Sequence, residues 1–243
     1  MATLLLWTRL GVLWGLSPMA SVLRAPPAVW VLWTLALAGL LSAGWSLQTP
    51  VPPQLLGWVW LLLGEATLGA LLGFSLHAAF AALNMAGRLL DLQMGLGMGA
   101  VLDPVSRSFS PAMATALSLV GMAVFWGSDG AELMLRGIAF SVQQLPPGGG
   151  FRLLAPAQLI APVAGMFSAA IVVLAPAIFI LLLLELVLAV LSRILPQMNV
   201  MFVGMPAKTL TGLAMAALLA PALAPLMHRL QRSAFAFWLG VGP

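Results

Sequence analysis

Long apolar stretches without a single charged side chain constrain this chain more than any other feature. They cover residues 28–47, 66–87, 111–128, 153–184 and 209–227, and a shorter one covers residues 10–23. A helix of about 20 residues crosses the hydrocarbon core of a bilayer. The sequence therefore predicts an all-α integral membrane protein with six candidate helices.

The composition agrees with this prediction. Of the 243 residues, 62% are hydrophobic and 7% are charged, which is more apolar surface than a soluble core of this size can bury. The first 24 residues also resemble a signal peptide, but Arg9 follows the first apolar residues and Pro18 interrupts the small-residue cleavage pattern. We expect this segment to remain in the mature protein.

Proline and glycine separate the apolar stretches. The segments QTPVPPQ (Gln48 to Gln54) and QQLPPGGGFR (Gln143 to Arg152) cannot continue a helix. The stretch 153–184 contains three prolines and is too long for one ordinary span, so it predicts either a kinked helix or two helices that meet at a bend. The expected fold consists of helical hairpins with broken or kinked helices.

The distribution of Lys and Arg does not orient a six-span topology. Cytoplasmic loops usually carry the excess of these residues. With the N-terminus outside, the inner side receives Arg24, Arg88, Arg107, Arg193 and Lys208, and the outer side receives Arg9, Arg136, Arg152, Arg229 and Arg232. The tie means that one of the spans is wrong or that the chain is not a simple six-pass protein.

Several functional classes have no support in the sequence. There is no Cys, which excludes thiol catalysis and disulfides. The ten Lys and Arg are scattered, so no basic face for nucleic acid is expected. His77 and His228 have no second ligand at metal spacing, and no catalytic triad is apparent. We expect no enzyme activity, no metal and no cofactor.

Ionisable residues within or beside the apolar stretches are functional candidates. Glu65 and Glu185 are each far in sequence from an opposite charge, and two interpretations remain open. They could relay protons in a transporter, or each could bind a polar group on a neighbouring helix or subunit. Arg88 with Asp91, and Glu132 with Arg136, have the spacing of local ion pairs on a helix.

The segment LQMGLGMGAVLDP, Leu92 to Pro104, interrupts the apolar pattern with three glycines at alternate positions. Each glycine weakens a helix by roughly 1 kcal/mol relative to alanine, so a local break is expected. The glycines do not form a dinucleotide-binding motif. Such a motif follows a β-strand and has a different glycine spacing, and the sequence shows neither. Methionines at 94 and 98 add flexible apolar side chains.

Elsewhere, Gly11 with Gly15 and Gly69 with Gly73 have the spacing of close helix packing.

Several motifs occur together in one order along the chain. They are LDLQMG (Leu90 to Gly95), LDP (Leu102 to Pro104) with Pro111, LPPGG (Leu145 to Gly149), and LPQMNVMFVGMPAK (Leu195 to Lys208). This ordered set, over nearly the whole chain, resembles the FliR family of type III export-gate proteins, which includes the SctT proteins of injectisomes. Asp91, Met198 and Met205 depart from the residues usual in that family.

The resemblance implies a non-enzymatic core subunit of the flagellar export gate in the bacterial inner membrane, at the basal body. It implies a single all-helical domain over residues 1–243, with a FliP-like part at 1–145 and a FliQ-like part at 151–243. The implied partners are FliP-like, FliQ-like and FlhB-like membrane subunits, membrane lipid, and the unfolded proteins that the gate exports.

The resemblance also assigns candidate residues. The segment 93–111 corresponds to a plug that helps close the export channel, with the candidate residues Gln93, Met94, Gly95, Gly97, Met98, Gly99, Asp103, Pro104 and Pro111. The glycines are expected to give the plug mobility and the methionines to give an apolar seal. Asp103 and Pro104 are expected to fix the turn that follows.

The second motif predicts a helix break between two prolines, with polar groups that bind neighbouring subunits or line the cytoplasmic entrance. Its candidate residues are Pro196, Gln197, Asn199, Gly204 and Pro206. A plain turn between two helices remains an alternative. For the whole protein, the alternatives are an injectisome export subunit and a proton-coupled transporter that uses Glu65 and Glu185.

Overall fold

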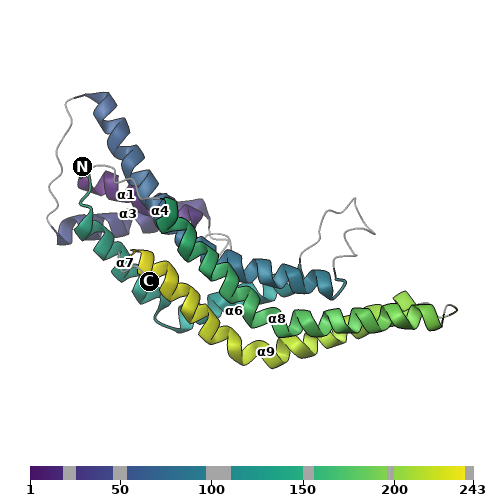
Figure 1. Cartoon of the computed structure of the whole chain (residues 1–243). Helices are drawn as coiled ribbons and strands as arrows, with labels where there is room; N and C mark the ends of the chain where they lie inside the picture. The colour runs from purple at the N-terminus through teal and green to yellow at the C-terminus, as the bar shows by residue number, and fades with distance from the viewer. Residues whose placement is uncertain are drawn as a thin grey trace. The chain divides into compact units, whose positions relative to one another are not determined.

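Figure 1 shows a computed structural model of the chain. The structure describes residues 1–18, 26–45, 54–96, 111–149, 156–195, 197 and 200–238. Its helices are α1 (Ala2–Leu16), α3 (Pro27–Gly44), α4 (Leu55–Gln93), α6 (Ala112–Gly127), α7 (Gly130–Gln144), α8 (Pro156–Ile194) and α9 (Val200–Trp238). No strand occurs within these ranges, which confirms the predicted all-α class.

Within the described parts of the chain, four helices are long and apolar enough to cross a membrane. These segments are Pro27–Gly44, Leu55–Gln93, Ile160–Ile194 and Phe202–Ala236, and a fifth span results if α6 and α7 are counted as one. The protein is therefore a multi-pass membrane protein. The described residues contain four or five such spans rather than the six expected, because the first candidate, at residues 10–23, overlaps α1, a helix of only 15 residues.

Of the two alternatives predicted for the stretch 153–184, the division into two helices is wrong, because α8 is one continuous helix of 39 residues despite its internal prolines. In addition, residues 130–144 form α7, which was not expected as a separate element. Its charged pair, Glu132 and Arg136, keeps this segment out of the charge-free stretches.

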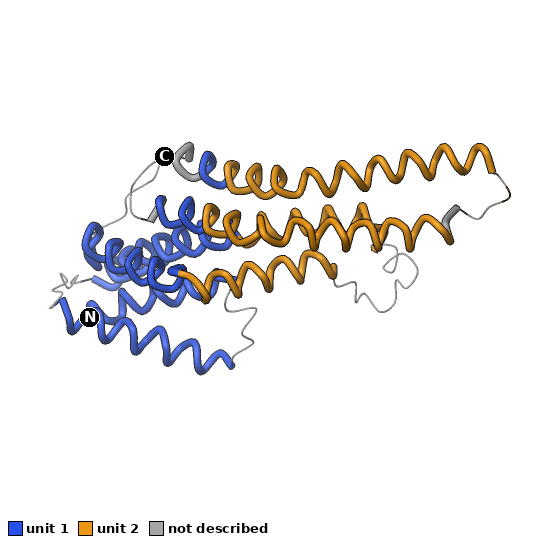
Figure 2. Tube along the Cα trace, turned by 90° about the horizontal axis from the view of Figure 1, so that it is seen from below, with its two compact units in different colours: residues 1–79, 129–163, 231–243 blue, residues 80–128, 164–230 orange. Residues whose placement is uncertain are grey.

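The chain divides into two compact units, coloured separately in Figure 2. Unit 1 contains Met1–Ala79, Asp129–Val163 and Gln231–Pro243, and unit 2 contains Phe80–Ser128 and Ala164–Leu230. Helices α4, α8 and α9 each contribute residues to both units. The division expected from the family, at residues 1–145 and 151–243, stays a prediction.

In unit 1, α1 packs directly on the first part of α4. A Cβ atom at Gly69 would overlap the backbone carbonyl of Arg9, and one at Gly73 would lie 2.9 Å from the backbone oxygen of Leu13. Only glycine permits this close approach of two helices. The predicted packing role of Gly69 and Gly73 is confirmed, whereas Gly11 and Gly15 have no neighbour within 4 Å of an added Cβ.

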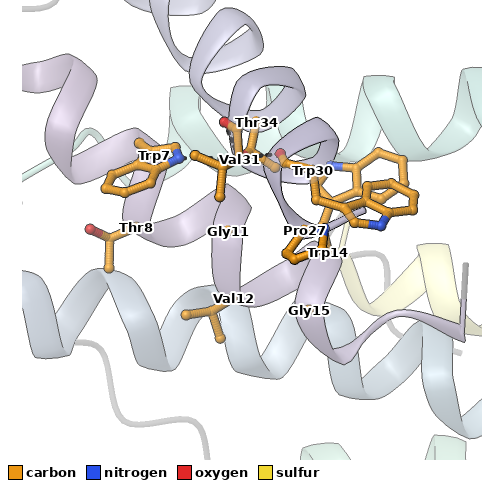
Figure 3. Close-up of a pocket in the computed structure, with 10 residues that line it drawn as sticks. All are labelled: Trp7, Thr8, Gly11, Val12, Trp14, Gly15, Pro27, Trp30, Val31 and Thr34. Atoms are coloured by element: carbon orange, nitrogen blue, oxygen red, sulfur yellow. Dashed lines mark hydrogen bonds between the residues drawn. The ribbon is translucent and has the colours of Figure 1, made fainter. Parts of the chain in front are cut away.

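Gly11 and Gly15 line an open groove between α1 and α3, shown in Figure 3. The indole N–H of Trp7 donates to Thr34 Oγ1 at 3.1 Å, and the rings of Trp14 and Trp30 pack with centroids 5.5 Å apart. Except for Thr8 and Thr34, the side chains that line the groove are apolar or aromatic. The prediction that Gly11 and Gly15 form a tight helix contact is therefore wrong for this chain by itself.

In unit 2, the second part of α4 packs against α6. The rings of Phe80 and Phe125 lie 6.1 Å apart between centroids, and both side chains are buried. The Asn84 amide donates to Ser118 Oγ at 3.2 Å. These contacts place the C-terminal end of α4 beside the N-terminal end of α6, where the candidate segment 93–111 begins and ends.

Candidate functional site

Asp91, near the end of α4, caps the N-terminus of α6. Its Oδ1 accepts the backbone N–H of Met113 at 2.9 Å, and its Oδ2 accepts that of Ala114 at 3.1 Å. These N–H groups belong to the first turn of α6, where no residue within the helix can accept them. The preceding Pro111 has no side-chain acceptor, so Asp91, which is 1% exposed, supplies the cap from another helix.

Gly95 terminates α4 in a defined conformation. Its φ is +78°, in the left-handed region that glycine adopts without strain. The N–H of Leu96 donates to the carbonyl of Asp91 at 3.0 Å, and the N–H of Gly95 donates to that of Leu92 at 3.1 Å. This pair of bonds is a Schellman motif. Gly95 therefore has a fixed structural role at the beginning of the candidate segment.

Asp91 thus binds both helix ends that flank residues 97–110. Its backbone carbonyl holds Leu96 after α4, and its carboxylate holds Met113 and Ala114 in α6. The negative charge also lies at the positive end of the α6 dipole, which is a favourable position for a carboxylate. The expected ion pair between Arg88 and Asp91 is not found among the described residues, because α6 occupies the carboxylate and Arg88 Nε donates to Asn84 Oδ1 instead.

Met94 is buried in unit 2 and packs on α9. It is 1% exposed, and a Cβ atom at Gly212 would overlap its side chain. The glycine therefore makes room for a bulky flexible side chain at the end of α4. In this structure Met94 belongs to the core of unit 2, and the apolar-seal role expected of Met94 and Met98 stays a prediction.

The remaining candidates of this segment are only partly described. Gln93 is the last residue of α4 and is half-buried, and Pro111 immediately precedes α6. The other candidates, Gly97, Met98, Gly99, Asp103 and Pro104, lie outside the described residues. The mobility and sealing roles of these residues stay predictions.

The second motif is mostly helical. α9 begins at Val200 and continues through Pro206, so the break that was expected to extend to Pro206 ends before Val200. Pro206 lies inside α9, where it removes one backbone hydrogen bond without ending the helix. Gly204 is buried against Leu188, and Gln197 is exposed in a turn. Pro196 and Asn199 lie outside the described residues.

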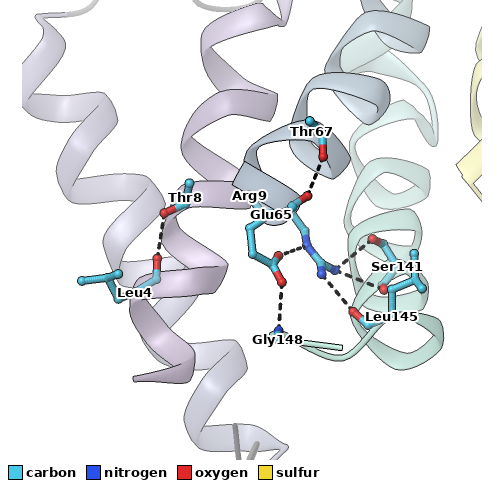
Figure 4. Close-up of polar contacts among 9 residues, drawn as sticks. Leu4, Thr8, Arg9, Glu65, Thr67, Ser141, Leu145 and Gly148 are labelled. Carbon is cyan, nitrogen blue, oxygen red and sulfur yellow. Dashed lines mark hydrogen bonds and ion pairs between the residues drawn. The ribbon is translucent and has the colours of Figure 1, made fainter. Parts of the chain in front are cut away.

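Glu65 forms a buried ion pair with Arg9 in unit 1, shown in Figure 4. The distance from Arg9 Nε to Glu65 Oε2 is 2.6 Å, and the two side chains are 1% and 4% exposed. The rest of the guanidinium donates to the carbonyl and hydroxyl of Ser141 and to the carbonyl of Leu145. Arg9 thereby provides a donor for the Leu145 carbonyl at the C-terminus of α7 and a second donor for the Ser141 carbonyl, which also accepts the Leu145 backbone N–H.

Glu65 also reaches the turn that follows α7. Its Oε1 accepts the backbone N–H of Gly148 at 3.1 Å, so the carboxylate joins α4 to this proline- and glycine-rich turn. The ion pair and its hydrogen bonds connect α1, α4, α7 and the turn. This arrangement favours the interpretation in which Glu65 binds a group on a neighbouring helix over the proton relay.

Glu185 is paired as well. Lys208 Nζ lies 3.1 Å from Glu185 Oε1, which links α8 to α9 within unit 2. The expected local pair of Glu132 and Arg136 is confirmed, with both side chains exposed. Within the described residues, no group of three or more His, Asp or Glu side chains has the arrangement of a metal site.

Two residues of these networks were missed in the sequence. Arg9 was counted as a loop charge, and Asp91 was paired with the wrong partner. The signal for Arg9 is a single cation inside an otherwise apolar helix, which predicts a buried partner. For Asp91, the signal has two parts. The carboxylate lies four residues before Gly95, which ends α4, and the next helix, α6, has no side-chain cap of its own.

Comparison with known proteins identifies the family. The model of "Bacterial export proteins, family 1" matches residues 1–234. This chain belongs to that family. The flagellar biosynthetic protein FliR of Escherichia coli (strain K12) is 31% identical over 179 residues, which cover 73% of this chain and 68% of that protein. FliR of Pectobacterium carotovorum is 32% identical over the same shares of the two chains.

The chain is also similar to an injectisome-type relative. The secretion system apparatus protein SsaT of Salmonella typhimurium is 31% identical over 157 residues, which cover 63% of this chain and 60% of SsaT. The comparisons confirm the resemblance to the FliR/SctT family, and with it the prediction of a type III export-gate subunit. The family match covers all of unit 2 and all of unit 1 up to residue 234.

Proposed function

We propose that this protein is a core subunit of the flagellar type III export gate, in the bacterial inner membrane at the basal body. The observation that carries the proposal is the family match over residues 1–234, together with the similarity to FliR of several bacteria. In this role the protein is not an enzyme and needs no cofactor. It assembles with FliP-like, FliQ-like and FlhB-like membrane subunits and lines the path of unfolded export substrates.

Within the gate, the segment 93–111 helps to close the channel. The support from the described residues is the way in which its two ends are held. Asp91 binds the chain on both sides of residues 97–110, and Gly95 ends α4 abruptly. A segment with fixed ends can act at one place in a channel, while Gly97 and Gly99 supply conformational freedom between them.

The decisive experiment is deletion of the gene, followed by assays of motility and of hook-protein secretion. Complementation with the wild-type chain is expected to restore both. A variant with Gly97→Ala and Gly99→Ala is expected to accumulate normally but to secrete poorly. Gly127→Ala is a matched control, because an added Cβ there has no neighbour within 4 Å. Normal motility after deletion would refute the flagellar assignment.

An injectisome subunit is the second candidate, and the similarity to SsaT favours it. Deletion would then leave motility intact and abolish secretion by the injectisome. A proton-coupled transporter is less well supported, because Glu65 and Glu185 are both engaged in ion pairs. A transporter would purify and function alone, whereas a gate subunit is expected to be unstable without its partners.

A further inference from the structure

The groove between α1 and α3 has apolar walls and glycines on its floor. Figure 3 shows Trp7 on one side of Gly11. The rings of Trp14 and Trp30 lie on the other side, with centroids 5.5 Å apart. An added Cβ at Gly11 or Gly15 would meet no atom within 4 Å, so the α1 backbone is open to the groove there. The groove has a volume of about 430 Å³, within the range of pockets that hold small ligands.

The residues that line the groove offer no free polar side chain to an occupant, and none of them is charged. The Thr8 hydroxyl donates to a backbone carbonyl one turn earlier at 3.0 Å. The Thr34 hydroxyl donates to the Trp30 carbonyl at 2.9 Å and accepts the Trp7 indole N–H at 3.1 Å. The Trp14 indole N–H is buried within the protein. A polar molecule would lose its hydrogen bonds to water here without replacement, so the occupant must be apolar.

The groove lies beside a helix that is suited to contact lipid, because α3 is long and apolar enough to cross the membrane. Its two hydroxyl residues, Thr34 and Ser42, both bond to side chains of α1. The outer face of α3 is exposed and apolar, with the side chains Val29, Leu32, Leu35 and Leu40. Trp30 and Trp33 lie in its first two turns, and tryptophan is enriched where a span meets the lipid headgroups. The groove is therefore next to hydrocarbon, near one end of the span.

The dimensions of the groove favour an extended chain over a helix of another subunit. Trp7 and Trp14 are separated by seven residues of α1, or about 10 Å along the helix axis. A helix with its side chains is about 10–12 Å thick, so about 10 Å of helix would occupy on the order of 1,000 Å³, more than twice the volume of the groove. A hydrocarbon chain, with its non-bonded neighbours about 3.5–4.0 Å from each carbon, is much thinner and can follow the glycine floor.

We propose that the groove between α1 and α3 binds one acyl chain of a membrane phospholipid. The chain enters beside Trp14 and Trp30, near the headgroups. It lies over Gly11 and Gly15 and extends towards Trp7. Dispersion contacts with the aromatic walls hold it there, because an empty groove would forfeit those contacts. This site goes beyond the proposed export function and depends only on the membrane-spanning character of the protein.

Larger side chains on the floor of the groove test the proposal. Gly11→Leu and Gly15→Leu each fill the space of the acyl chain, and the new Cβ meets no protein atom within 4 Å. Gly64→Leu on α4 is the matched control, because its Cβ is equally free and it does not line the groove. The assembled complex is purified in nanodiscs of phosphatidylethanolamine and phosphatidylglycerol that contain a phospholipid with a photoreactive diazirine in its acyl chain. After irradiation, the labelled residues are mapped by mass spectrometry.

We expect lipid labels on residues 7–15 of α1 in the wild type and in Gly64→Leu, and loss of these labels in both groove variants. Labels on the outer face of α3, at Leu32 and Leu35, should persist in every variant, because surrounding lipid reaches them without the groove. Labelling of α1 that is unchanged in both groove variants would overturn the proposal. A wild-type complex without lipid labels on α1 would overturn it as well, and would indicate that another subunit covers the groove.

The readout is independent of export. Val12→Phe, which narrows the groove from the same helix, replaces a glycine variant that fails to assemble. A complex that binds lipid in the groove but does not support secretion would count against the proposed function alone. A complex that secretes normally and has no lipid in the groove would count against this inference alone.

Discussion

Arg9 and Glu65 lie 56 residues apart in the sequence, yet the guanidinium Nε and the carboxylate Oε2 are 2.6 Å apart in the core of unit 1. Two charges buried together are stable only if their remaining hydrogen-bonding groups are also satisfied. Ser141, Leu145 and Gly148 provide these additional partners. The pair thus determines how α1, α4 and α7 pack, rather than serving as an independent charge relay.

Removal of either charge is therefore expected to be severe. Arg9→Ala or Glu65→Ala should each lower the free energy of unfolding by about 3–5 kcal/mol, because the other charge remains buried and unpaired. The double variant Arg9→Met with Glu65→Leu should lose less than the sum of the two single losses. Thermal unfolding of the purified complex would measure this. Arg136→Ala, which breaks an exposed pair, is the control and should change stability by at most about 0.5 kcal/mol.

Gly69→Ala should disrupt the packing of α1 on α4. The added methyl group overlaps the backbone of Arg9, which cannot move aside as a flexible side chain could. Overpacking of this kind typically destabilises by about 1–3 kcal/mol. Gly64→Ala on the same helix and Gly11→Ala on α1 are matched controls, because neither new Cβ has a neighbour within 4 Å. Equal accumulation of all three variants in the membrane would contradict the packing described here.

Asp91→Ala should release the first turn of α6. Loss of a helix cap costs about 0.5–2 kcal/mol, and here the two N–H groups of Met113 and Ala114 lose their acceptor together. Hydrogen–deuterium exchange should become faster in a peptide that covers this turn. Pro111→Ser, which places a hydroxyl at the capping position, should partly restore protection. If Arg88→Ala accelerated exchange as much as Asp91→Ala, the capping role of Asp91 would be wrong.

Gly95→Ala should destabilise the end of α4 by about 1 kcal/mol, since alanine rarely adopts a positive φ. Gly95→Asn should be milder, because asparagine tolerates this conformation better. A comparison of both variants with Gly97→Ala separates a capping effect from a mobility effect in secretion assays. A secretion defect in Gly95→Ala that Gly95→Asn does not relieve would point to a role beyond the helix cap.

The helices themselves could largely be predicted from the sequence, because a charge-free apolar stretch leaves few alternatives. The errors occurred in segments that contain charged residues. Glu132 and Arg136 excluded α7 from the apolar stretches, although their own spacing indicates a helix. Arg9 was placed in a loop because its partner lies on another helix, and no local pattern reveals a contact between residues so distant in sequence.

The candidate site could be predicted only in part for the same reason. The three glycines indicate a break, and Gly95 does end α4. The partner of Asp91 depends on how α6 returns to α4, which the hydrophobic pattern does not specify. Met94 illustrates the limit most clearly, since its burial depends on Gly212 in a helix that begins more than a hundred residues later.

Because Asp91 holds the chain both before and after residues 97–110, the positions of the two helix ends do not depend on how many residues lie between them. Insertions, deletions or whole exchanges of this connection between related proteins should leave α4 and α6 in register. The connection can therefore change in length without displacing the two helices that it joins.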